Sequence, residues 1–336
     1  MLVPGSVLVT AAGIAAGPVP IPLSSLTRIL GHELGFGPAE LGAELESHRN
    51  IVMSTRIPRV LLGFAVGAGL ALAGCVVQVL VRNILAEPYL LGISSGATAG
   101  AAASILFGYG SALGVWGLTG SAFAGAIAAI VLVLAVSGIG GTANSTRLIL
   151  AGIAVSFMLA ALTNFMVFAS QGQSGARSVL FWMLGSLQQA RWEQLAPTWL
   201  TVVLAGAVFW LWSRRLDALA LGDDASRSLG IDAPAFRRLA FLLVAFLVAV
   251  VVSVSGSIGF VGLVVPHLAR RAVGAVHRLV LPVSALMGGA LLVAADLVAR
   301  TAFAPRELPL GILTALLGTP LLLILVHRFN RRRNET

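Results

Sequence analysis

The sequence predicts an all-α integral membrane protein with about ten transmembrane helices. Of its 336 residues, 58% are hydrophobic and only 10% are charged, whereas a soluble domain carries roughly 25% charged residues. A helix crosses a bilayer core with about 20 consecutive apolar residues, and ten windows approach that composition. They cover residues 2–17, 60–81, 89–107, 115–136, 148–169, 195–212, 239–254, 258–273, 279–299 and 308–326. We expect one transmembrane domain covering residues 1–336.

The first window is short and begins at the initiator methionine without a basic flank. It fits a shortened span, a start codon assigned too late, or the core of a signal peptide, and we favour the shortened span. Residues 18–55, which follow, are rich in Gly, Pro, Glu and Ser and are too polar to span. We place them outside the membrane.

The basic residues predict the orientation of the chain. All 22 are arginine. With the amino terminus inside, the arginine-rich segments 214–238, 270–278 and 328–333 fall on the cytoplasmic side, as the positive-inside rule requires. We therefore expect a multi-pass protein of the cytoplasmic (inner) membrane with both termini in the cytoplasm. The net charge of +9 follows from this topology, and we expect no nucleic-acid partner.

Two polar connections show amphipathic character. Residues 171–194 contain a candidate interfacial helix near 178–187, with Trp182 and Trp192 at headgroup depth, although an ordinary aromatic belt explains the tryptophans equally well. The longest cytoplasmic connection, residues 214–238, has an apolar stripe interrupted by Gly222 and Gly230. This pattern predicts two short helices, which form either a docking element for another protein or a solvated connector.

The residues exclude several functions. A phosphate-binding P-loop needs a lysine, and this chain has none, so any ATP hydrolysis must occur on a separate ATPase subunit. We find no paired nucleophile and base within the spans and therefore expect no enzyme. Cys75 is the single cysteine and His267 has no neighbouring ligand at metal-binding spacing, so we expect no metal site.

Asp296 is the clearest carboxylate inside a span. It lies four residues before Arg300, so both side chains share one helix face and are expected to form an internal ion pair. A gradient-driven carrier usually has more ionisable residues within its spans. This class stays open as the less favoured alternative to a transporter driven by a separate ATPase.

Three segments resemble one family. Residues 56–97 read RIPRVLLGFAVGAGLALAGCVVQVLVRNILAEPYLLGISSGA; residues 256–300 and the run ELPLGILTALLGTPLLLIL after them form a second match, and LALGDDASRSLG a third. Their order and spacing resemble the FecCD family of ABC permeases, which import siderophores, haem and cobalamin. The resemblance implies a type II ABC importer permease fold with ten spans. It departs at Ile84, where the family has proline, and we expect the second span to continue about a turn further inward.

The resemblance also implies partners. A second permease subunit, identical or homologous, would complete the pathway; two ATPase subunits would carry ATP and Mg below it, and an extracytoplasmic substrate-binding protein would dock above. This chain itself would bind no cofactor. The implied cargo is a ferric siderophore, with haem or cobalamin as alternatives that these residues do not separate.

Family positions assign roles to individual residues. The residues implied in docking the binding protein are Arg56, Arg59 and Arg300, where simple anchoring at the membrane interface is the alternative for the first two. Those implied in contact with the ATPase, within the coupling loop 214–238, are Gly222, Ala225, Leu229 and Gly230. Those implied in the cytoplasmic gate are Asn83, Leu85, Ser145 and Thr146, where helix capping is the alternative for the last two.

Overall fold

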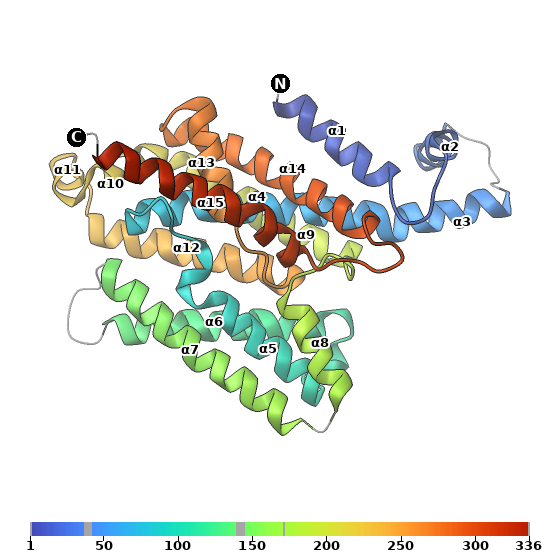
Figure 1. The fold of residues 1–336 in the computed structure, drawn as a ribbon, viewed down its shortest axis with the longest axis horizontal. Helices are drawn as coiled ribbons and strands as arrows, with labels where there is room; N and C mark the ends of the chain where they lie inside the picture. Colours follow the sequence, from blue (N-terminus) through green and yellow to red (C-terminus); the bar gives the residue numbers. More distant parts are fainter. Residues whose placement is uncertain (1, 37–41, 139–144, 171, 335–336) are drawn as a thin grey trace.

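A computed structural model of the protein describes residues 2–36, 42–138, 145–170 and 172–334, and within them every regular element is a helix (Figure 1). The α-helices are α1 (Leu2–Ala15), α2 (Leu23–Glu33), α3 (Ala43–Ile51), α4 (Ile57–Val81), α5 (Ile93–Phe107), α6 (Val115–Gly138), α7 (Ser145–Ala169), α8 (Gln173–Met183), α9 (Trp192–Leu211), α10 (Ser213–Leu221), α11 (Asp223–Ser228), α12 (Ala233–Ser255), α13 (Val261–Val273), α14 (His277–Thr301) and α15 (Leu310–Asn334).

Each of the ten apolar windows overlaps one of these helices, but the expected count of about ten spans is not confirmed. Six helices of the described residues are long and apolar enough to cross a membrane. They are Ala43–Val81, Trp116–Gly138, Arg147–Ala169, Trp192–Leu211, Ala233–Ser255 and His277–Thr301. Three more are apolar but shorter, Leu2–Ala15, Ile93–Phe107 and Leu310–Leu323. The remaining window forms α13, whose 13 residues include two arginines.

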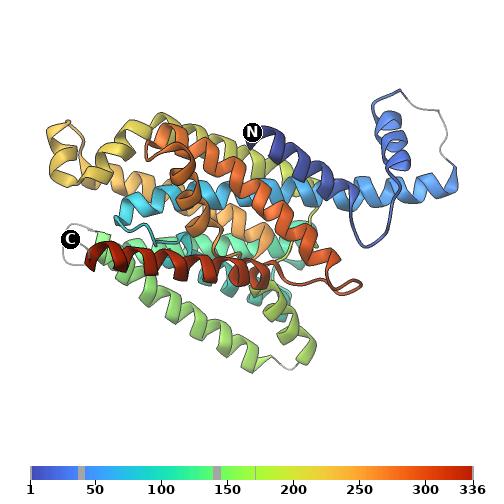
Figure 2. The same ribbon diagram turned by 45° about the horizontal axis from the view of Figure 1, so that its top comes forward.

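Helix α4 occupies the centre of the molecule and packs against α9, α12, α13 and α14 (Figures 1 and 2). Small residues make these contacts close. A Cβ on Gly67 would lie 2.2 Å from the carbonyl oxygen of Gly288, and one on Gly74 would lie 1.9 Å from that of Gly262. Helices that lack a hydrophobic driving force between them in lipid associate through such close backbone packing.

Helices α5, α6 and α7 form a second group that packs on α12. Figure 1 shows this group, together with α8, below the central helices. Helices α10 and α11 lie at one end of the long axis, whereas α2 and α3 project beyond the bundle at the opposite end (Figure 2). Helix α3 continues into α4 through a π-helical segment, Val52–Arg56.

Two breaks interrupt helical structure inside the fold. A 3₁₀ turn, Pro88–Leu91, leads into α5, and residues 256–260 connect α12 to α13. The Tyr89 hydroxyl joins them, since it donates to the carbonyl oxygen of Ile258 and accepts from its N–H, both at 2.9 Å. The Glu87 carboxylate accepts from the N–H of Phe260 at 2.6 Å. These bonds satisfy backbone groups that would otherwise be unpaired in a membrane interior.

The expectation that the second span continues past Ile84 is wrong. Helix α4 ends at Val81 because Arg82 adopts a left-handed conformation with φ 52°. The N–H of Asn83 then donates to the carbonyl oxygen of Gln78, and the N–H of Arg82 to that of Val79. This pattern is a Schellman C-cap, which ends the helix without needing a proline.

A short helix forms in the region of the candidate interfacial helix with shifted bounds, and its position at the membrane interface stays a prediction. It is α8, Gln173–Met183, and it begins earlier than expected. Trp192 starts the next helix, α9, and its indole N–H donates to the carbonyl oxygen of Met53 at 2.7 Å. This tryptophan therefore connects α9 to the π-helical segment before α4.

Candidate functional sites

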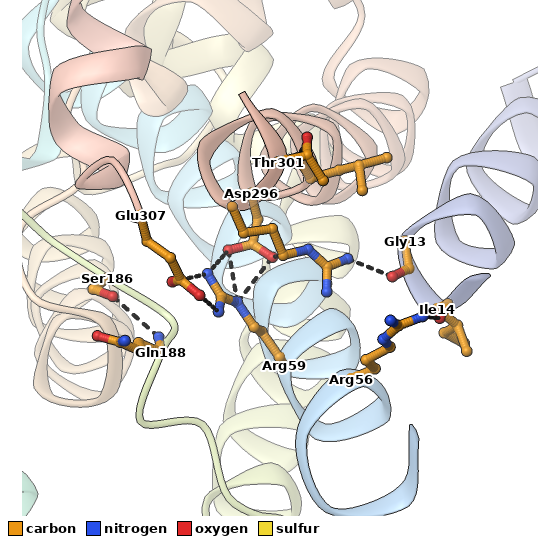
Figure 3. A network of polar contacts seen from close by, with 11 residues as sticks. Gly13, Ile14, Arg56, Arg59, Ser186, Gln188, Asp296, Thr301 and Glu307 are labelled. Atoms are coloured by element: carbon orange, nitrogen blue, oxygen red, sulfur yellow. Dashed lines mark hydrogen bonds and ion pairs between the residues drawn. The ribbon is translucent and has the colours of Figure 1, made fainter. Parts of the chain in front are cut away.

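A buried cluster of charged residues lies where α4, α14 and the segment before α15 meet (Figure 3). The Arg59 Nε is 2.9 and 3.0 Å from the two carboxylate oxygens of Asp296, and its Nη2 is 2.8 Å from one of them. The same guanidinium binds Glu307 in a second bidentate pair at 3.0 and 2.9 Å. Arg59 therefore uses all of its nitrogens on two carboxylates, which is the strongest geometry for such pairs.

The other two arginines of this end are held mainly by backbone oxygens. Arg300 Nε lies 3.6 Å from Asp296, and its Nη2 donates to the carbonyl oxygen of Gly13 on α1. Arg56 donates to the carbonyl oxygen of Ala15 at 2.6 Å, to that of Ile14 at 3.2 Å, and to that of Val19. Together these contacts bind the end of α1 to α4 and α14.

The structure thus brings together the three arginines that the family positions imply in docking, and it shows that all three are buried, with 2% of Arg56, 5% of Arg59 and 2% of Arg300 exposed. The predicted pair between Asp296 and Arg300 is confirmed. The closer partner, Arg59, was not predicted because 237 residues separate it from Asp296. Contact between these arginines and a binding protein stays a prediction.

The connection between α9 and α12 forms the two predicted short helices, α10 and α11. Gly222, with φ +123°, separates them, and Gly230, with φ +75°, ends α11. The N–H of Ile231 donates to the carbonyl oxygen of Ser226, and that of Gly230 to the carbonyl oxygen of Arg227. Both glycines adopt backbone conformations that other residues rarely take, so glycine at these two positions determines where the short helices begin and end.

The two helices bury one side and expose the other. Leu216 and Leu219 are fully buried on the bundle side, whereas Leu221 and Leu229 are 76% and 63% exposed. Ala225 is half-buried. A cleft of about 490 Å³ lies beside this element, lined in part by Leu229, Gly230 and Phe236. Leu221 and Leu229 thus expose apolar side chains on this element, and docking of a partner there stays a prediction.

Asp223, the first residue of α11, joins three parts of the fold. Its carboxylate accepts from Arg237 of α12 at 2.7 Å and from Arg82, which follows α4. A second carboxylate, Asp217 of α10, accepts from the backbone N–H of His277 at 3.1 Å and lies 2.5 Å from its Nδ1. The short helices are therefore fixed to α4, α12 and α14 by charged side chains.

We expect the attachment of α11 to depend on the ionisation of Asp223. Its hydrogen bond from Arg237 lowers the pKa of this carboxyl below its ordinary value. A carboxyl whose pKa is lower in the folded state than in the unfolded state stabilises the fold at pH values above its unfolded pKa. This contribution is lost as the pH falls through its folded pKa. Asp223→Asn should therefore increase proteolysis of residues 214–230 at pH 7, and this effect should decline as the pH falls through the lowered pKa of Asp223, with Asp224→Asn, whose carboxylate is fully exposed, as the control.

The proposed gate residues are described only in part. Asn83 is exposed beyond the end of α4, and its Oδ1 accepts from the backbone N–H of Leu85 at 2.9 Å. Ser145 and Thr146 are the first residues of α7, but their side chains lie outside the described part of the chain. The gating role of all four residues stays a prediction.

The described residues contain no group of three or more His, Cys, Asp or Glu side chains that would hold a metal ion. Among them, His267 and Cys75 likewise have no such neighbours, and Cys75 donates to the Ser284 hydroxyl at 3.2 Å. The charged residues described above instead attach helices to one another.

Comparison with known proteins identifies the family of this chain. The model of the FecCD transport family matches residues 6–328. The chain is 39% identical to the cobalamin import system permease protein BtuC of Halobacterium salinarum over 91% of this chain and 80% of that one. It is also 39% identical to the hemin transport system permease protein HmuU of Yersinia pestis, over 90% of this chain and 94% of that one.

A solved structure shows the same fold. It is an inward-facing conformation of an ABC transporter described as of the metal-chelate type, with a TM-score of 0.81, 31% identity and 97% coverage of both chains. The protein is therefore a member of the FecCD transport family, an ABC transporter permease that lies in the membrane as a multi-pass helical chain.

Proposed function

We propose that this permease carries an iron chelate, a ferric siderophore, inward across the cytoplasmic membrane. The observation that supports a chelate over a free ion is the lack of any cluster of metal ligands among the described residues, because a bare cation would need such ligands along its route. Similarity to a transporter of the metal-chelate type supports the same class. Haem and cobalamin are the alternative cargoes, favoured by the names of two relatives that are 39% identical.

Uptake by cells that contain or lack the gene tests this proposal. We expect loss of uptake of radiolabelled iron supplied as a ferric siderophore, with uptake of haem, labelled cobalamin and ferric citrate unchanged. Loss of haem or cobalamin uptake alone would replace the siderophore with that cargo. Unchanged uptake of all four, in a strain without a second such transporter, would contradict the cargo class.

ATP hydrolysis would occur on two separate ATPase subunits that bind the end of the bundle formed by α10 and α11. The exposed Leu221 and Leu229, the half-buried Ala225 and the adjacent cleft supply a contact surface there. The bonds from Asp217 and Asp223 to His277, Arg237 and Arg82 would transmit displacement of this surface to α14, α12 and α4. A gradient-driven carrier would not need this attached element.

Substitution of Gly230 tests the coupling role. A Cβ at Gly230 meets open space, so Gly230→Trp causes no clash within this chain. The substitution is disfavoured by the positive φ of this position, and it places a bulky side chain on the surface that we assign to the ATPase. We expect the complex to continue to hydrolyse ATP but to transport roughly tenfold less cargo per ATP, a ratio that corresponds to about 1.4 kcal/mol.

Gly108 supplies a matched control. It also has a positive φ, +73°, and an open Cβ position, but it follows α5 and belongs neither to the surface formed by α10 and α11 nor to α2 and α3. Gly108→Trp should leave the ratio of transport to hydrolysis unchanged. Equal ratios for wild type and Gly230→Trp would remove Gly230 from the coupling surface.

A substrate-binding protein would dock at the end that carries α2 and α3, which we place outside the membrane. The charged cluster there has three arginines and two carboxylates, and Arg56 is paired with backbone oxygens alone among the described residues. The cluster thus keeps a positive excess that would attract acidic residues of a binding protein. A second permease subunit would complete the pathway, and both termini would lie in the cytoplasm.

A further inference from the structure

A cavity of about 250 Å³ opens between α5, α7, α8 and the connection from α12 to α13. Six of its eight lining residues have polar, uncharged side chains. The lining residues are Ser94, Ser95, Thr98, Ala160, Thr163, Asn164, Met183 and Ser257. Three of them, Ala160, Thr163 and Asn164, belong to the apolar span Arg147–Ala169, so the cavity lies within the membrane-crossing part of the chain.

Part of this polar lining is satisfied within the protein. The Thr98 hydroxyl donates to the carbonyl oxygen of Ser94, and that of Thr163 to the carbonyl oxygen of Leu159, both at 2.9 Å. The hydroxyls of Ser94 and Ser257 bond to each other across the two helix breaks. By contrast, the Ser95 hydroxyl and the Asn164 amide have no hydrogen-bond partner among the residues that the structure describes.

The surface around the cavity is strongly apolar. Along the same helix, Phe157, Phe165 and Phe168 are 74%, 65% and 87% exposed. An amide with several donor and acceptor sites is costly in hydrocarbon when it is unpaired. Polar groups at membrane depth therefore face a bundle interior or an aqueous cavity, and they mark routes for substrates. Asn164 is exposed and unpaired among the described residues, which fits a water-filled route and not a lipid-facing surface.

We propose that Asn164 and Ser95, with the hydroxyls beside them, form a hydrogen-bonding station for the cargo on the wall of the translocation pathway. This inference rests on the proposed function. The lining has no charged residue, His or Cys, so it suits uncharged polar groups on the periphery of a chelate, such as amides and hydroxyls, and not the metal. Because ligand pockets for whole drug-sized molecules occupy about 300–1,000 Å³, this smaller cavity would receive one arm of a large chelate.

Cysteine accessibility tests the aqueous position without needing the cargo. Cys75 is the single cysteine and is buried, so Cys75→Ser gives a background into which Asn164→Cys and Ser95→Cys can be placed. The complex of permease and ATPase, reconstituted in liposomes, would be treated with a membrane-impermeant maleimide. Only a thiolate in water reacts, so we expect labelling about tenfold faster at both positions than at Leu204→Cys, an exposed position on the apolar helix α9.

Slow labelling at both positions, equal to that of Leu204→Cys, would mean that lipid covers the cavity and would overturn the proposal. This outcome does not depend on which cargo is transported.

Transport by Asn164→Leu tests the contact with the cargo. The leucine keeps the branched shape of the side chain but removes the amide, so uptake of the transported chelate should fall by roughly three- to tenfold, the effect of one or two lost hydrogen bonds. Asn164→Gln should restore part of this loss, whereas Phe165→Leu, next to it but outside the cavity, should have no effect. ATP hydrolysis and the amount of complex in the membrane should stay at the wild-type level.

The two proposals fail in different ways. If the wild-type complex transports none of the four cargoes, the proposed function fails whatever the variants do. If the wild type transports a chelate and Asn164→Leu transports it equally well, only the station is overturned. A general loss of complex in Asn164→Leu would move the test to Asn164→Gln, which must then keep a wild-type amount of complex and part of the wild-type transport for the proposal to stand.

Discussion

Asp296→Asn is expected to lower the free energy of unfolding by about 3–5 kcal/mol, the usual cost of removing one partner from a buried ion pair. The side chains of Arg59 and Arg300 are 5% and 3% exposed, and both lie within 3.6 Å of this carboxylate. The asparagine leaves two buried guanidinium groups with a single carboxylate, Glu307. Thermal unfolding of the purified complex in detergent would measure the loss.

Glu307→Gln is the matched control for this prediction. Glu307 binds the same guanidinium through two hydrogen bonds, but its side chain is 24% exposed. Water can replace much of the lost interaction, so we expect a loss nearer 1 kcal/mol. Equal stabilities of Asp296→Asn and wild type would show that the cluster does not hold α4 to α14. Arg59→Gln combined with Asp296→Asn should cost less than the sum of the single changes, because each removes the same contact.

This cluster also limits how docking can be tested. Replacing Arg59 by glutamate would place three acidic groups together at a buried position, since Asp296 and Glu307 already face it. Failure of such a variant to bind a partner would then report loss of folding. Any test of docking at this end therefore needs a measurement of stability beside the measurement of binding.

Gly74→Ala is expected to destabilise the protein by about 1–3 kcal/mol through overpacking. The new Cβ would lie 1.9 Å from the carbonyl oxygen of Gly262 and 2.7 Å from its Cα. Backbone atoms cannot rotate away as a side chain does, so α4 and α13 must separate. The same separation would disturb the bonds from Gln78 to the carbonyl oxygens of Gly262 and Leu263.

Gly120→Ala serves as the control, because a Cβ on Gly120 meets no atom within 4 Å. Alanine is a better helix former than glycine by about 0.5–1 kcal/mol, so this variant should be neutral or slightly more stable. Thermal unfolding of both variants gives the comparison. A neutral Gly74→Ala would show that α4 and α13 can adjust to the added methyl group.

Residues that are close in sequence account for the local structure of this chain. Apolar windows placed the helices, Gly222 and Gly230 placed the breaks around α11, and the spacing of Asp296 and Arg300 placed both on one face. These features follow from neighbours within a few residues, since helical periodicity and the backbone freedom of glycine are local properties. The family resemblance rested on the same runs of sequence and is confirmed.

Tertiary structure decided the features that depend on distant neighbours. Ile84 did not predict that Arg82 would end α4 in a left-handed conformation beside Asp223. Burial of the three arginines also followed from packing, since α1 supplies the oxygens that bind Arg56 and Arg300. In the sequence, Asn164 is one polar residue in an apolar span, and only the fold places the hydroxyl groups of α5 and Ser257 around the same cavity.

The sequence by itself therefore determined the class of protein, its helices and its family, while the folded chain decided which polar groups are paired and which remain available. The physical reason lies in the membrane: apolar composition alone is enough to place a helix in lipid. A buried charge or amide, however, is stable only where packing brings a partner or water to it.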